Sequence, residues 1–65
     1  MNIIEGIQEE IKRVNEIIAE YQKIPAGVFA ATLMKASIEN AEKSIAFGDT
    51  VEMIKAFNEL QGYTL

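Results

Sequence analysis

Apolar residues recur along the first third of the chain at a spacing typical of a helix that packs along one side. Between residues 4 and 21 the intervals are 3, 4, 3, 4 and 3, a heptad pattern held for nearly three repeats. The residues of this seam are Ile4, Ile7, Ile11, Val14, Ile18 and Tyr21. Ile3, Ile17 and Ile24 form a second apolar line beside it. The pattern predicts a helix over residues 2–22 with a wide apolar face.

A second helix is expected directly after a proline. Pro25 disfavours the α conformation at Ile24 and suits the first turn of a new helix. Gly48 follows at a position typical of a left-handed C-cap. Segment 25–47 between them is apolar on two nearly opposite faces, one formed by Ala31, Met34, Ile38, Ala41 and Ile45, the other by Phe29, Leu33, Ala36 and Phe47. A helix that is apolar on two faces is expected to pack on two sides.

The third helix begins with a capping box. Asp49 stands at the N-cap and Glu52 follows three residues later. The apolar face of segment 50–61 consists of Val51, Met53, Ile54, Phe57 and Leu60, and Gly62 closes it. The pattern leaves open whether the tail at residues 63–65 packs on the helices.

These elements predict an all-α fold in a single domain over residues 1–65. Helices 2–22 and 25–47 are expected to form an antiparallel helical hairpin, with the shorter third helix against one side. One apolar stripe of the second helix would meet the first helix, and the other would meet the third. The leftover apolar residues predict a surface for a homo-oligomer: Ile3, Ile17, Ile24 and part of the Phe29/Phe47 stripe.

Composition strengthens the expectation of self-association. A chain of 65 residues buries a small core, and the absence of cysteine and histidine excludes disulfides and the common zinc sites. The hydrophobic fraction of 49% is high for so small a soluble domain. Apolar side chains are therefore expected to meet another copy of the chain.

The charge pattern argues against nucleic-acid and membrane partners. The net charge is −4, and lysines are scattered among acidic residues, so neither DNA nor RNA is expected as a partner. Glu9 and Arg13 stand in the favourable i,i+4 order. No apolar run is long enough to span a membrane, and the first ten residues lack the features of a signal peptide. A cytoplasmic location is expected.

Catalysis is not expected either. The chain has no histidine or cysteine base or nucleophile and no glycine-rich phosphate motif. The carboxylate pairs Glu16/Glu20 and Glu39/Glu42 could formally hold a divalent cation, but they are more typical of a solvated helix face. The prediction is a protein that is not an enzyme, with no cofactor and no metal.

The junction between the first two helices is the candidate ligand site. A helix starting at Pro25 would present backbone N–H groups and a positive dipole end to an anion, and a glycine would let that anion approach. The residues predicted to bind a nucleotide-like ligand are Tyr21, Lys23, Ala26, Gly27, Phe29, Thr32 and Lys35. The alternative is a tight αα turn with Phe29 in the core.

Residues 21–60 resemble small phage and prophage proteins in which a Pro-Ala-Gly turn precedes a Phe/Ala-rich helix. The segment "SIAFGDTVEMIKA" at residues 44–56 carries the rest of that likeness. Small oligomeric phage proteins often act by stoichiometric binding, so the resemblance implies a protein that sequesters an immune nucleotide signal, of the cyclic nucleotide or ADP-ribose type. It would then work in the cytoplasm of the host cell. The alternatives are a helical module that inhibits a host factor, or a structural oligomer without a ligand.

Overall fold

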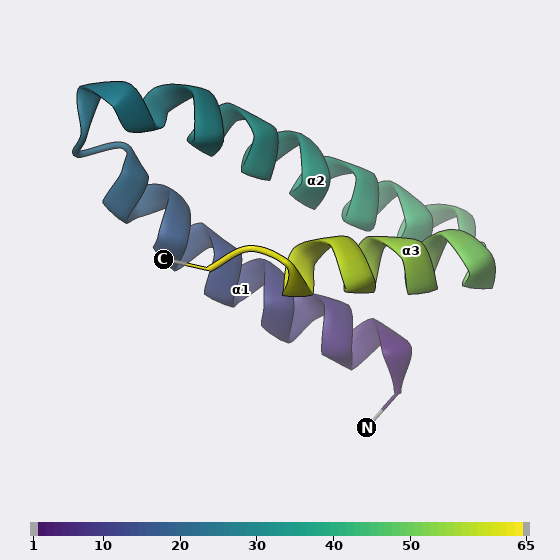
Figure 1. Cartoon of the computed structure of the whole chain (residues 1–65). Coiled ribbons are helices and arrows are strands. Elements are labelled where there is room, and N and C mark those ends of the chain that lie inside the picture. The colour runs from purple at the N-terminus through teal and green to yellow at the C-terminus, as the bar shows by residue number, and fades with distance from the viewer. Residues whose placement is uncertain (1, 65) are drawn as a thin grey trace.

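The structure of the protein is a computed structural model that describes residues 2–64 (Figure 1). It contains α1 (Ile3–Tyr21), the short 3-10 helix η1 (Pro25–Gly27), α2 (Val28–Phe47) and α3 (Thr50–Gln61). No strand occurs in this part of the chain, which confirms the all-α class. Met1 and Leu65, the ends of the predicted domain, lie outside the described residues.

The helices form one packed unit. α1 and α2 run away from the turn that they share, and α3 lies against both (Figure 1). The buried core takes residues from all three helices: Ile7, Val14, Ile17 and Ile18 from α1, Ala31, Met34, Ile38 and Ala41 from α2, and Met53, Ala56 and Leu60 from α3. No helix within residues 2–64 combines the length and apolar character needed to cross a membrane.

Local caps define the helix ends. The Asn2 side chain accepts a hydrogen bond from the Glu5 N–H at 2.9 Å, and the Asp49 carboxylate accepts one from Glu52 N–H at 3.2 Å. Gly48 adopts the left-handed conformation with φ of 66°, which residues with a Cβ rarely adopt. The first turn expected of the second helix is 3-10 rather than α, so α2 proper begins at Val28.

Gly6 in α1 has a packing role. A Cβ at this position would lie 3.0 Å from Cε1 of Phe57. The missing side chain therefore gives the Phe57 ring of α3 room against α1, and this offsets the weak helix propensity of glycine.

Two predictions about which surface each apolar line contacts are wrong: the Ile3/Ile17/Ile24 line is not an exposed oligomer surface as a whole, and the Phe29/Phe47 stripe does not pack on α3. Ile17, assigned to an oligomer surface, is only 4% exposed, and Ile3 packs against the core. Only Ile24 of that line is exposed. The exposed Phe29, Leu33, Ala36 and Phe47 do not meet α3 as expected.

Small polar residues take the place of that stripe in the contact with α3. Ser37 of α2 is 4% exposed, and its hydroxyl donates to the carboxylate of Glu59. Ser44 is also buried and donates to the Ala41 carbonyl at 2.6 Å. α3 thus packs along an edge of α2 that carries short side chains, which leaves the Phe29/Phe47 stripe uncovered.

Candidate functional site

The predicted ligand-binding residues lie at or just beyond the turn between α1 and α2. Tyr21 ends α1, Lys23 lies in the turn, and Ala26 and Gly27 belong to η1. Phe29, Thr32 and Lys35 follow on the first two turns of α2. The sequence therefore brings these residues to one end of the molecule.

Three backbone amides of the turn, those of Lys23, Ile24 and Gly27, donate within the chain. Lys23 N–H donates to the Glu20 carbonyl at 3.2 Å, and Ile24 N–H donates to the Tyr21 carbonyl at 3.1 Å. Gly27 N–H donates to the Ile24 carbonyl at 2.8 Å. The prediction that Gly27 offers a free amide to an anion is therefore wrong, because the 3-10 turn uses that donor.

Gly27 instead allows the chain to turn closely past the end of α1. It is buried, and a Cβ there would lie 2.3 Å from the Tyr21 backbone oxygen and 3.1 Å from the Tyr21 ring. Its φ of −84° is open to any residue, so the restriction is one of space. Replacing Gly27 by valine would therefore disturb the turn itself.

The predicted side chains differ in how far they are free to bind. The Lys23 ammonium lies 3.3 Å from the Glu20 carboxylate, with most of the lysine side chain exposed. The Thr32 hydroxyl donates to the Val28 carbonyl at 3.0 Å and retains its acceptor lone pairs. Lys35 is exposed, and Tyr21 is half-buried against the core.

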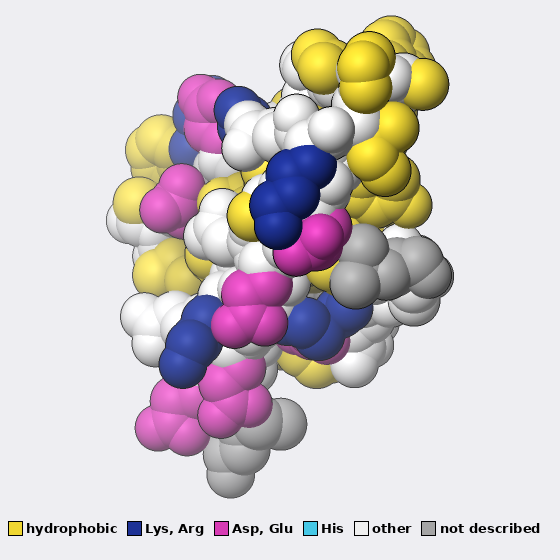
Figure 2. Space-filling model, turned by 90° about the vertical axis from the view of Figure 1, so that its left-hand side faces the viewer, with side chains coloured by type: hydrophobic (Ala, Val, Ile, Leu, Met, Phe, Trp, Pro, Cys, Tyr) yellow, Lys and Arg dark blue, Asp and Glu magenta, His cyan; other side chains and the backbone are white. Residues whose placement is uncertain are grey.

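An exposed apolar surface, the turn patch, lies at the same end. It consists of Ile24, Val28, Phe29 and Leu33. Phe29 is 75% exposed, so the alternative prediction that it belongs to the core is wrong. Figure 2 shows hydrophobic side chains gathered near the top of the view, at the end where α1 and α2 join. A folded chain gains nothing from large apolar side chains in water, so such a cluster is typical of a binding surface.

The main hollows of the described surface lie elsewhere. The best defined of these, with a volume of about 510 Å³, is an open groove between α2 and α3 with Phe47 at one end. Its charged lining residues are Lys43, Asp49, Glu52, Lys55 and Glu59. Lys55 pairs with Glu52 at 3.5 Å, and Lys43 with Glu39 at 3.4 Å. Cations and carboxylates alternate there, so the groove favours no single sign of ligand.

No group of three or more potential metal-ligating side chains occurs within residues 2–64. The Glu16/Glu20 and Glu39/Glu42 pairs each include a carboxylate that already faces a lysine, through Glu20–Lys23 and Glu39–Lys43. The geometry gives these pairs no further ligand.

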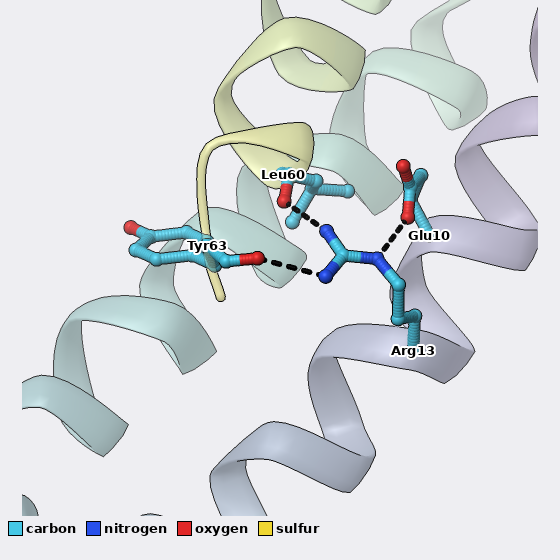
Figure 3. A network of polar contacts seen from close by, with 4 residues as sticks. All are labelled: Glu10, Arg13, Leu60 and Tyr63. Carbon is cyan, nitrogen blue, oxygen red and sulfur yellow. Dashed lines mark hydrogen bonds and ion pairs between the residues drawn. The ribbon is translucent and has the colours of Figure 1, made fainter. Parts of the chain in front are cut away.

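A polar network around Arg13 was not predicted. The guanidinium donates from Nε to Glu10 at 2.5 Å, from Nη1 to the Tyr63 carbonyl at 2.7 Å and from Nη2 to the Leu60 carbonyl at 2.8 Å (Figure 3). Arg13 therefore pairs with Glu10 rather than with Glu9. It supplies the positive charge at the C-terminal end of α3, whose own last turn has no basic residue.

The signal for this network was present in the sequence but ambiguous. An arginine can pair with carboxylates three or four residues before it, and Glu9 and Glu10 offered both. Nothing in the helical period shows that the carbonyls of Leu60 and Tyr63 lie opposite Arg13, because that contact joins residues about fifty positions apart.

Comparison of the chain with protein-family models, with curated proteins and with solved structures found no match.

Proposed function

We propose that the protein is a non-enzymatic, phage-type binding protein that forms a homo-oligomer and sequesters a nucleotide-derived immune signal. The ligand, of the cyclic nucleotide or ADP-ribose type, would bind at the end of the molecule that carries the α1–α2 turn. The observation that carries the proposal is the turn patch, where an aromatic ring 75% exposed stands among other apolar side chains.

Self-association is supported by how much apolar surface one chain leaves open. Ile24, Val28, Phe29 and Leu33 are each about half exposed or more, and so is Phe47 on the same stripe of α2. Exposed aromatic and aliphatic side chains are the anchors that protein interfaces bury. A second copy that covers the stripe would add to the small core of each chain.

A ligand site between subunits agrees with the geometry of a single chain. None of the four best-defined hollows of the described residues is lined by a predicted ligand-binding residue. A neighbouring copy placed over the turn patch would supply the missing wall. Phe29 would then stack against a base, while Lys23, Lys35 and the Thr32 hydroxyl would face phosphate or ribose oxygens.

The test is calorimetric titration of the protein with a panel of cyclic nucleotides and ADP-ribose derivatives. The expected result is saturable heat with at least one member of the panel, and no heat with any of them would contradict ligand binding. Phe29→Ala should weaken that binding about tenfold or more, because base–aromatic stacking is lost.

Val51→Ala provides the matched control for the ligand contact. Val51 is 61% exposed but lies on α3, outside the turn patch and the Phe29/Phe47 stripe, so its loss should leave the affinity for the nucleotide unchanged. Equal weakening by both changes would show that the aromatic ring at position 29 is not a specific contact.

The alternative is a protein-interaction module that blocks a host factor through the same turn patch. The patch favours this reading as well, because apolar anchors suit a protein partner. Heat denaturation of the purified protein, followed by identification of any molecule that is released, distinguishes the two proposed functions. A released nucleotide supports sequestration, whereas a stoichiometric protein partner that Phe29→Ala abolishes supports the module.

A further inference from the structure

The tail, residues 62–64, joins α3 to both other helices. Arg13 on α1 donates to the tail backbone at the Tyr63 carbonyl, and the Tyr63 hydroxyl lies 2.7 Å from Ser37 Oγ on α2. Figure 3 shows the guanidinium of Arg13 between Glu10 and the two carbonyls. The tail is thus held to α1 through its backbone and to α2 through a side chain.

The tail covers one edge of the core. Thr64 and Arg13 line a hollow of about 400 Å³ together with Glu16, Ile17 and Glu20 of α1. Ile17 is 4% exposed in the closed arrangement. Glu20 pairs with Lys23, so the covered edge lies next to the predicted ligand-binding residues.

The tail is held by a few polar contacts and by the Tyr63 ring, which packs against the core. The Arg13 side chain is 38% exposed, Gly62 and Thr64 are exposed, and only Tyr63 is half-buried. The α-helix has ended at Gln61, and the backbone bonds that follow are short turns from Gly62 to Glu59 and from Tyr63 to Leu60. Rotation at Gly62 can therefore move the tail while α3 stays formed.

We propose that the tail is a releasable strap that Arg13 and the Tyr63 hydroxyl hold closed. Opening at Gly62 exposes the α1–α3 edge of the core at Ile17, beside Glu20, without unfolding of the helices. The strap is a property of the single chain and does not depend on the proposed ligand.

Amide hydrogen exchange of the full chain tests the strap. In Arg13→Gln the amide of Tyr63 should exchange about tenfold faster or more, because two charge-assisted hydrogen bonds are lost. The amides of Ile38 and Ala41 in the middle of α2 should keep their rates. Lys12→Gln changes charge at the neighbouring exposed position and should change neither set.

Tyr63→Phe removes only the hydroxyl and leaves the Arg13 contacts in place. It should also accelerate the Tyr63 amide without affecting Ile38 or Ala41. Unchanged tail rates in either variant would overturn the proposal. Acceleration of tail and core amides by the same factor would overturn it too, since the tail would then open only with global unfolding.

Discussion

Gly27 sets how closely the chain can turn between α1 and α2. The Tyr21 carbonyl lies where a Cβ of residue 27 would stand. The Gly27 amide closes the 3-10 turn by donating to the Ile24 carbonyl. The sequence also favours a ligand-binding role for Gly27, because a glycine after a proline is typical of an anion-binding helix start. Close packing and close approach of a ligand both require glycine, so the residue type alone could not separate them.

Gly27→Ala should destabilise the fold by about 1–3 kcal/mol, the usual cost of forcing an added group into a filled space. Urea unfolding followed by circular dichroism measures the change. Ala26→Ser, at the exposed neighbouring position of η1, is the control and should have little effect. A Gly27→Ala variant as stable as the unaltered protein would contradict the role given to this residue.

At the scale of the helices, the sequence was informative about helix ends and about part of each inner face. Val51 and Ile54, predicted on the apolar face of α3, are exposed. Asp49 and Gly48 act through local backbone geometry, which a short motif specifies. Ile7, Val14 and Ile18 are buried because a heptad spacing places them on one face. The all-α class follows from such local patterns.

The sequence did not show which helix packs against each apolar face of α2. The helical periodicity of the sequence shows which residues of α2 lie on the same stripe. Which helix covers that stripe depends on contacts between residues far apart in the sequence. Serine is a polar residue that is usually exposed, yet Ser37 and Ser44 are buried, because their short side chains let α3 approach α2. Phe29 and Phe47 lie on the stripe that was expected to meet α3, yet they are the most exposed of the large apolar side chains in the described chain.

Asp49→Ala should lower the free energy of unfolding by about 1 kcal/mol, because the Glu52 N–H at the start of α3 loses its acceptor. Thermal unfolding of the variant measures this. Asp49→Asn keeps an acceptor oxygen at the cap and should retain most of the stability. If the alanine and asparagine variants were equally destabilised, the hydrogen bond could not be the cause.

At the scale of the whole molecule, polar contacts help to join the three helices, while an apolar patch at the α1–α2 turn stays uncovered. The Arg13 network and the Ser37–Glu59–Tyr63 contacts fasten α3 to α1 and α2, while the turn patch remains without a partner in the single chain. Self-association through that patch and ligand binding beside it form one account, because the second copy would complete the site.

Native mass spectrometry of the protein, alone and with the nucleotide panel, tests that account most directly because one spectrum reports subunit number and bound ligand together. The account predicts an assembly at a multiple of 7.2 kDa that gains the mass of a nucleotide, and a shift towards the single chain in Phe29→Ala. A protein that stays at the mass of one chain and gains no ligand at any concentration used would contradict it.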